Sequence, residues 1–579
     1  MNIPIRRYGS LLSAYLRPQW RRVAALALLL GGGIGLQLLN PQILRSFIDD
    51  ASAGAATDRL VTLAGFFIGI AFLNQLATVG ATYVSENIGW TATNALRNAL
   101  AAHCLGLDMS FHKQRTSGEL IERIDGDIDA LSAFFSQLAV GVLSNLALMT
   151  GALGLLFLED WRVGLALLLF ALTALAVLVR LRSLAVPSLA ATREASAQFF
   201  GFLGERLAGT EDIRANGGTG AVMRQFHRHT SAWLPLQRRA SLAMYAMWMT
   251  TIGLFAIGNA VAFGISAALW RSGSISIGTV YMIFYYTELL RRPIEQIRTQ
   301  IQDLQRAGAS IGRVEELRAT QPTILDGPGD ALAGGPLAVE CDGVGFGYDD
   351  ERVLESISLR LAPGRVLGLL GRTGSGKTTL ARLILRLYDV SAGAIRLGGT
   401  DVREVTVAAL RQRVGIVTQD VQLFHATVRD NLTFFNPAIP DERLREALDQ
   451  LGLGPWLAGL PRGLDTELAG SGSLSAGEAQ LLAFARLFLA DPGLIILDEA
   501  SSRLDPATEQ LIERAVSRLL AGRTGIIIAH RLATVQRADD ILILERGEIL
   551  EHGPRADLAA DQDSRFAGLL RTGLSEVLA

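Results

Sequence analysis

Long uncharged stretches fill the first half of the chain. Five of them contain no Asp, Glu, Lys or Arg, and they lie between Arg22 and Arg45, Arg59 and Glu86, Asp129 and Glu159, Arg162 and Arg180, and Arg239 and Arg271. A helix crosses roughly 30 Å of hydrocarbon with about 17–25 apolar residues, because each residue adds about 1.5 Å. Each stretch is therefore long enough to span a membrane.

A sixth stretch is less apolar. It begins near Ile275, meets Glu288 early, and continues as an amphipathic helix with apolar residues three and four positions apart. This pattern predicts a helix that leaves the bilayer and runs on into the cytosol. The expected transmembrane domain covers residues 1–318, with six spans at about 23–45, 60–85, 132–158, 162–181, 241–270 and 275–300.

The charges of the loops indicate their side of the membrane. Five arginines precede the first span, Arg6, Arg7, Arg17, Arg21 and Arg22, while the next loop, DDASAGAATD, carries only acidic residues. Lys and Arg near span ends stay on the cytoplasmic side. We therefore expect an integral protein of a bacterial inner or plasma membrane with both termini in the cytoplasm. No small-residue cleavage site follows the first apolar run, so no removable signal peptide is expected.

Two inner segments are polar and helical in pattern, so their helices should extend well past the membrane. The tips of these cytoplasmic extensions lie near residues 111–120 and 209–216. We expect the tips to rest on a cytosolic domain. The alternative is that they are solvated helical hairpins of mixed charge.

A linker at residues 319–336, dense in Gly and Pro, ends the first domain. After it, short β-type runs alternate with helical patterns: RVLGLLG, GKTTLARLILRLY, PGLIILDEASS and TGIIIAH. This alternation is typical of helices packed on a parallel sheet. The sequence predicts an all-α six-helix transmembrane domain followed by an α/β domain at residues 337–579.

The composition restricts the partners. Half of the residues are hydrophobic, only 19% are charged, and the net charge of -2 provides no basic face for nucleic acid. The two cysteines, Cys104 and Cys341, are too far apart in sequence to predict a disulfide framework or a metal cage. We expect both to stay reduced.

The stretch GRTGSGKTTL contains the pattern G-x-x-x-x-G-K-[ST], with Gly371, Gly376, Lys377 and Thr378 at the fixed positions. It follows an apolar strand and precedes a helix, which is the context that this motif needs. The glycines let backbone N–H groups surround phosphates, Lys377 would reach the β- and γ-phosphates, and Thr378 would ligate Mg²⁺. The α/β domain is therefore predicted to be a P-loop NTPase.

A second motif, LIILDEAS, consists of a buried strand followed by two acids. Ligand chemistry in α/β sheets gathers at the carboxyl ends of the strands. Asp498 would hold Mg²⁺ through water, and Glu499 would act as general base on the attacking water. Alone, this pattern is more often an ordinary acidic turn, but the phosphate loop makes the catalytic interpretation the better one.

Together with five further elements, these motifs make nearly the whole chain resemble the ATP-binding cassette (ABC) transporters, and more narrowly the exporters with six spans ahead of the cassette. The segment LSAGE at 474–478 resembles the family signature LSGGQ. The resemblance implies that Ser475 and Gly477 contact the γ-phosphate of ATP.

Four single residues also match the family pattern. Gln419 matches the glutamine loop that senses Mg²⁺ and the membrane domain, and His530 matches the switch histidine on the γ-phosphate. Tyr348 matches the aromatic that stacks on adenine, and Asp505 matches the loop between the two nucleotide sites.

The predicted sites follow from the two motifs and the resemblance. The cofactors would be ATP and Mg²⁺. The nucleotide-binding residues would be Tyr348, Gly371, Thr373, Gly374, Ser375, Gly376, Lys377, Thr378, Thr379, Ser475, Gly477 and Asp505. The Mg²⁺ site would use Thr378, Gln419 and Asp498, and the catalytic residues would be Glu499, His530 and Gln419.

The resemblance further implies a dimer, because the phosphate loop of one cassette and the signature of the other enclose each ATP. The second half-transporter is either another copy or a related chain. Three departures favour a related chain: Ala476 and Glu478 alter the signature, its spacing from TEL is shortened, and Arg503 stands where a small residue is usual. They are mild, so a homodimer stays open.

The cargo is the least defined feature. Polar residues within the spans, Gln37, Asn40, Asn74, Gln75, Asn145, Tyr245, Asn259, Tyr281, Tyr285 and Tyr286, either line a cavity or bond neighbouring helices, and the second is favoured. The few charges favour lipidic or amphipathic cargo over small ions. Export is the expected function. The alternatives are an importer built on the same fold and an ATP-gated, channel-like protein.

Overall fold

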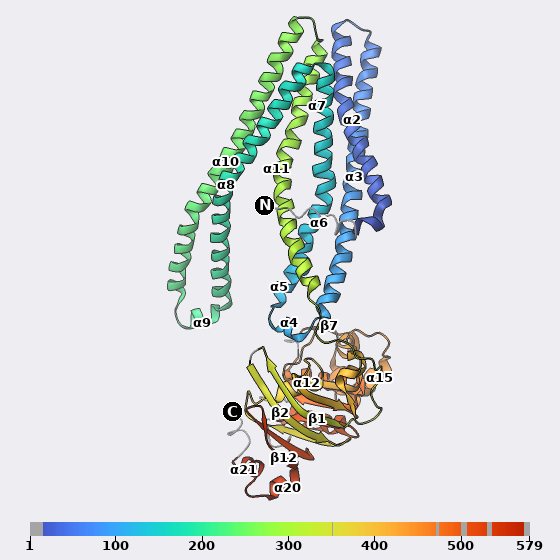
Figure 1. Cartoon of the computed structure of the whole chain (residues 1–579), viewed down its shortest axis with the longest axis vertical. Helices are drawn as coiled ribbons and strands as arrows, with labels where there is room; N and C mark the ends of the chain where they lie inside the picture. The colour runs from blue at the N-terminus through green and yellow to red at the C-terminus, as the bar shows by residue number, and fades with distance from the viewer. Residues whose placement is uncertain (1–14, 350, 471–473, 499–505, 530–534, 573–579) are drawn as a thin grey trace. The chain divides into compact units, whose positions relative to one another are not determined.

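The computed structural model describes residues 15–349, 351–470, 474–498, 506–529 and 535–572 (Figure 1). The chain forms two compact units. The first comprises residues Met1–Leu105 and Thr116–Thr320, and the second comprises Gly106–Arg115 and Gln321–Ala579. The short segment Gly106–Arg115 thus belongs to the unit that contains the β-sheets.

All regular elements that the structure describes in the first unit are helices. Its α-helices are α2 (Trp20–Ser52), α3 (Thr57–Leu105), α5 (Ser117–Ile121), α6 (Asp127–Gln137), α7 (Ser144–Glu159), α8 (Trp161–Ala208), α9 (Thr210–Ala215), α10 (Thr219–Arg271) and α11 (Ile277–Ala319). Two π-helical turns flank α6, at Glu122–Gly126 and Leu138–Leu143, and a 3₁₀ turn precedes α2 at Arg17–Gln19.

Five helices in the described part of the chain are long and apolar enough to cross a membrane: Arg17–Ser52, Thr57–Leu105, Gly141–Glu159, Trp161–Ala208 and Thr219–Arg271. The sixth expected span falls in α11, where Glu288, Arg291 and Arg292 interrupt the apolar run. That span stays a prediction.

Three helices are much longer than a bilayer requires. Helices α3, α8 and α10 contain 49, 48 and 53 residues, which at about 1.5 Å per residue gives roughly 75 Å each. Figure 1 shows α8 and α10 side by side along their length and joined by α9, whereas α2 packs against α3. The helices therefore have the length to carry their tips far from an apolar layer of about 30 Å.

The spans pack through apolar faces. One core joins α7, α8, α10 and α11 and includes the fully buried residues Leu156, Ala174 and Tyr286. A Cβ added at Gly258 of α10 would lie within 2.6 Å of two ring atoms of Phe170 on α8. The absence of a side chain at this glycine is what lets the two helices approach there.

The described residues of the second unit form three sheets. A six-stranded sheet has the order β12–β11–β3–β10–β9–β6, and its strands are parallel except for β12. A four-stranded antiparallel sheet has the order β2–β1–β4–β5, and β7 pairs with β8. The strands are β1 (Val339–Tyr348), β2 (Glu351–Leu361), β3 (Val366–Leu370), β4 (Ala392–Leu397), β5 (Thr400–Asp401), β6 (Val414–Val417), β7 (His425–Thr427), β8 (Glu467–Ala469), β9 (Leu494–Asp498), β10 (Thr524–Ile528), β11 (Asp540–Glu545) and β12 (Glu548–Pro554).

Helices cover the parallel sheet, as expected for strands whose residues are buried on both faces. The α-helices are α4 (Met109–Lys113), α12 (Lys377–Ile384), α13 (Val407–Arg413), α14 (Val428–Thr433), α15 (Asp441–Gln450), α16 (Gly454–Gly459), α17 (Ala476–Ala490), α18 (Pro506–Leu520), α20 (Arg555–Ala560) and α21 (Arg565–Thr572). Two 3₁₀ turns lie at Val402–Glu404 and Gly463–Asp465. The predicted architecture is confirmed: a region of long apolar helices is followed by an α/β domain.

Candidate nucleotide site

The phosphate loop joins β3 to α12. β3 lies between β11 and β10, and all five of its residues are buried. Three loop glycines have positive φ angles: 147° at Gly371, 82° at Gly374 and 104° at Gly376. A Cβ at Gly371 would collide with the backbone oxygen of Leu544, and one at Gly376 would lie 2.5 Å from Leu354 Cδ2. Both backbone conformation and space therefore require glycine at these two positions.

Lys377 begins α12, and its side chain bends back over the loop. The residue is buried, and Nζ donates to the carbonyl oxygens of Gly371 at 2.6 Å and Arg372 at 2.9 Å. Burial lowers the pKa of this ammonium, while the charge of Asp498 acts in the opposite direction. Because both of these bonds reach neutral carbonyls, an anion such as a phosphate would be a stronger partner for the charge.

Two hydroxyls and one carboxylate complete the surroundings of the loop. Thr378 Oγ1 donates to Asp498 Oδ2 over 3.2 Å, and Asp498 ends β9 at the carboxyl edge of the parallel strands. Ser375 is buried, and among the described residues its Oγ has no hydrogen-bond partner. A buried hydroxyl without a partner is costly. A bound phosphate would supply the missing acceptor.

The residues present also fit a magnesium ion. Within the described ranges, no three His, Cys, Asp or Glu side chains form a metal cluster. Mg²⁺ does not require one, because it is usually bound by one or two carboxylates together with substrate phosphates and water. Asp498 beside the Thr378 hydroxyl offers this kind of incomplete oxygen site.

Tyr348 lies at the end of β1, close to α12. Its hydroxyl is 3.5 Å from Thr379 Oγ1 and accepts a hydrogen bond from Arg382 Nη1 at 3.4 Å. The rings of Phe346 and Tyr388 stand at 88° and 86° to the Tyr348 ring, so neither stacks on it. The structure thus brings the predicted adenine-stacking residue, the phosphate loop and Asp498 into one region.

Other predicted site residues lie apart from this cluster. Gln419 is exposed and follows β6, the strand beside β9. Ser475 caps α17, and its Oγ accepts from Glu478 N at 3.3 Å and lies 2.7 Å from Glu478 Oε2. Gly477 is buried in the first turn of the same helix. Among the residues that the structure describes, no hydrogen bond joins Gln419, Ser475 or Gly477 to the phosphate loop. Glu499, Arg503, Asp505 and His530 lie outside the described residues.

The polar residues of the spans behave in two ways. Several bond neighbouring helices: Asn145 Nδ2 donates to Gln296 Oε1 at 2.6 Å, Asn259 Nδ2 to Glu288 Oε1 at 2.7 Å, and Tyr286 Oη to Leu38 O at 2.7 Å. Gln37, Asn74 and Asn145 also line a half-open cavity of about 180 Å³ between α2, α3, α7 and α11. Polar residues of the spans therefore both bond neighbouring helices and line a cavity, and Asn145 does both.

Sequence reasoning missed the residues of α4 that lie beside Tyr348. The Lys113 ammonium lies 4.2 Å from the centre of the Tyr348 ring. Lys113 lies within the helical tip expected at residues 111–120. The positive charge of this residue was the only feature of the sequence that could have indicated a contact with an aromatic ring. Nothing local in the sequence specifies which aromatic ring it would meet.

Comparisons with known proteins cover both units. Residues 23–294 match the family described as ABC transporter transmembrane region, and residues 354–502 match the family described as ABC transporter. The chain is 30% identical to the uncharacterized ABC transporter ATP-binding protein YknV of Bacillus subtilis, over 98% of this chain and 94% of that protein. It is 31% identical to the ATP-dependent lipid A-core flippase of Thiobacillus denitrificans, over 98% and 99%. Among solved structures, a bacterial Atm1-family ABC exporter with ATP bound is similar with a TM-score of 0.80 and 25% identity, over 95% of this chain and 99% of the other.

Proposed function

Because this chain belongs to the ABC transporters, and is an exporter-type half-transporter with fused membrane and ATPase domains, we propose that two copies of it form the working pump. The protein is an integral membrane protein that hydrolyses ATP to drive transport. Its sequence contains each motif that a nucleotide site needs, and the signature keeps Ser475 and Gly477 although Ala476 and Glu478 depart from the family pattern. A second copy can therefore supply the elements that one copy cannot bring to its own phosphate loop.

The phosphate loop would hold the triphosphate. The Lys377 ammonium would leave the carbonyls of Gly371 and Arg372 for the β- and γ-phosphates, and the backbone N–H groups at the start of α12 would face the same anion. Phosphate oxygens would also give the buried Ser375 hydroxyl its acceptor. This unpartnered hydroxyl, beside a buried ammonium bonded to neutral carbonyls, is the observation that carries the proposal.

Magnesium would be held by the Thr378 hydroxyl, Asp498 and Gln419. When bound, Mg²⁺ neutralises charge on the phosphates and fixes their orientation. The hydrogen bond between Thr378 and Asp498 keeps both of these residues at the carboxyl edge of the sheet. Glu499, directly after β9, would position and deprotonate the attacking water, and His530 and Asp505 would complete the site.

The signature would act on the other copy. Ser475 and Gly477 lie at the N-terminus of α17, where backbone N–H groups and the helix dipole favour an anion. Their location in an element separate from the phosphate loop supports a site completed across two chains. Hydrolysis would then weaken the contact between the cassettes, and the two-state equilibrium of the membrane domain would shift.

The membrane domain would comprise residues 1–318 with six spans, followed by a linker at 319–336 and the ATPase at 337–579. We place it in a bacterial inner membrane with both termini in the cytoplasm. The cavity between α2, α3, α7 and α11 is lined by apolar, amide and hydroxyl side chains and by one cation, Arg292. This lining suits an amphipathic or lipidic substrate, because it offers both hydrophobic contact and hydrogen bonds.

The proposal is tested by measuring Mg²⁺-ATPase activity of the chain purified alone in lipid nanodiscs, beside a Glu499→Gln variant. We expect activity in the unaltered chain and a loss of at least about 100-fold in the variant, the usual contribution of a general base. Bound ATP without hydrolysis in the unaltered chain would show that the second half-transporter is a different protein.

Direction is tested with inverted membrane vesicles and a labelled amphipathic substrate. ATP-dependent accumulation inside the vesicles is the expected result and means export. ATP-dependent depletion would mean import, and a passive leak that opens with ATP would mean gating.

A further inference from the structure

The segment Gly106–Arg115 packs with the ATPase domain through defined contacts. Asp108 Oδ2 accepts hydrogen bonds from Thr323 N at 2.5 Å and Thr323 Oγ1 at 2.6 Å, and Oδ1 accepts from Ile324 N at 3.4 Å. Leu107 and Phe111 are each 7% exposed. These contacts fix α4 beside the segment that enters β1.

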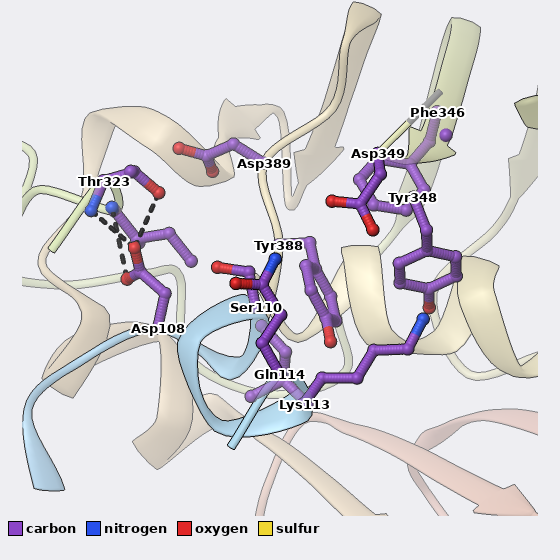
Figure 2. A pocket seen from close by; sticks show the side chains of 13 residues that line it. Asp108, Ser110, Lys113, Gln114, Thr323, Phe346, Tyr348, Asp349, Tyr388 and Asp389 are labelled. Carbon is purple, nitrogen blue, oxygen red and sulfur yellow. Dashed lines mark hydrogen bonds between the residues drawn. The ribbon is translucent and has the colours of Figure 1, made fainter. Parts of the chain in front are cut away.

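From this position, Lys113 reaches the ring of Tyr348. Its Nζ lies 4.2 Å from the ring centre, within the range of a cation–π contact. Figure 2 shows the lysine side chain extended from α4 toward the tyrosine, with Asp108 bonded to Thr323 on the far side of α4. Within the described part of the chain, Lys113 forms no ion pair of 4 Å or less with a carboxylate.

A pocket of about 240 Å³ adjoins this contact. Its lining includes Lys113 of α4 and the next residue, Gln114, together with Tyr348 and Asp349 at the end of β1, and Tyr388 and Asp389 after α12 (Figure 2). All lining residues belong to the second unit. A cavity of about 240 Å³ is large enough for one heterocyclic base next to the Tyr348 ring.

The Tyr348 ring is surrounded by other groups on several sides. Phe346 and Tyr388 stand nearly perpendicular to it, and its hydroxyl contacts Thr379 and Arg382. A flat base that stacks on the ring needs a ring face, and the Lys113 ammonium already covers one. The face and the ammonium attract each other because of the ring quadrupole.

We propose that Lys113 is a positioning residue that competes with the adenine base for Tyr348. It covers the ring while the nucleotide is absent, and base stacking displaces it. This inference rests on the proposed function, in which Tyr348 stacks on adenine. The coupling between the two contacts is reciprocal. If the contact of Lys113 with Tyr348 lowers the affinity of the protein for ATP by a given factor, bound ATP weakens the contact of α4 with Tyr348 by the same factor.

The expected effect is modest and specific to the base. Removing the ammonium should raise ATP affinity about two- to fivefold, which corresponds to the about 0.5–1 kcal/mol of an exposed cation–π contact at about 1.4 kcal/mol per tenfold. Inorganic triphosphate has no base, so its affinity should not change.

The test is isothermal titration of the full chain in nanodiscs, without Mg²⁺ so that no ATP is hydrolysed. ATP and inorganic triphosphate are titrated into the unaltered chain and the Lys113→Met, Lys113→Arg and Arg115→Met variants. Arg115 is the matched control, because its guanidinium lies over Phe111 at 4.2 Å. We expect tighter ATP binding only in Lys113→Met, since arginine can also cover the ring, and no effect of Lys113→Met in a Tyr348→Leu background.

Several results would overturn the inference. Unchanged or weaker ATP binding in Lys113→Met would show that the ammonium does not compete with the base. An equal gain for triphosphate would show a general change in the site. The proposed function fails separately, if the unaltered chain binds neither ATP nor triphosphate or if a Lys377→Ala variant binds triphosphate as tightly as the unaltered chain does.

Discussion

At the scale of single residues, the phosphate loop depends on the absence of side chains. Gly371 combines a positive φ with a backbone oxygen at the place of its missing Cβ. Gly374 also has a positive φ, but a Cβ there would meet nothing within 4 Å. An alanine at Gly374 would meet only backbone strain, whereas an alanine at Gly371 would meet backbone strain and a steric clash. Comparing the two substitutions therefore separates the two costs.

We predict that Gly371→Ala weakens ATP binding about fivefold or more, because the loop must move away from Leu544 at a cost of about 1–3 kcal/mol. Gly374→Ala should have the smaller effect, because only strain of about 1–2 kcal/mol opposes it and the loop can relax. Titration with ATP measures both. Equal losses in the two variants would show that collision with Leu544 is not the decisive term.

The buried cysteines give a second prediction at this scale. Burial raises the pKa of Cys341 to about 12. At pH 8 only about one thiol in ten thousand would be the reactive thiolate. We therefore expect iodoacetamide to leave Cys341 unmodified in the native protein and to modify it after unfolding in urea, as read by mass spectrometry. Rapid native labelling would contradict this burial.

At the scale of helices, one ion pair joins α6 to α11. The Asp127 carboxylate is 3% exposed and accepts hydrogen bonds from Ser310 Oγ at 2.9 Å and Arg313 Nε at 2.8 Å. A second nitrogen of Arg313 contacts the same carboxylate. The ion pair between Asp127 and Arg313 thus links α6 to α11, and its carboxylate is shielded from water.

We predict that Arg313→Met lowers the free energy of unfolding by about 1–3 kcal/mol, less than a fully buried pair would lose because the Arg313 side chain is about half exposed. Asp127→Asn should lower the free energy of unfolding by less, because it leaves no unpaired charge in the buried position, whereas Arg313→Met leaves the Asp127 carboxylate buried without its partner. Thermal unfolding in detergent compares the variants. A larger loss in Asp127→Asn would contradict the account.

The local elements were the most predictable part of the molecule. The run VLGLL before Gly371 forms β3, and the residues after Gly376 form α12, because strand and helix formation and the glycine requirement depend on neighbours in sequence. The boundaries of the long helices were less predictable: α8 continues through Pro187, and α10 through Pro235. Tertiary packing there overrides the preference of proline for helix ends.

At the scale of the whole molecule, the sequence predicted which elements exist better than which residues meet. Thr378 and Asp498 are 120 positions apart, and only their motifs indicated that they would lie together. The contact between Lys113 and Tyr348 has no such motif, so it became visible only in the structure. Contacts of this kind depend on chain topology rather than on local pattern.

The central claim is that two copies enclose ATP between the phosphate loop of one and the signature of the other. It is tested most directly with two differently tagged chains, one with Arg372→Cys and the other with Ser475→Cys, mixed in one membrane and oxidised with and without ATP. The natural cysteines are buried and should contribute little background. We predict a disulfide between the two tags that forms only with ATP. A chain that still binds ATP but gives no product between chains, or a double variant that closes its disulfide within one chain, would contradict the account.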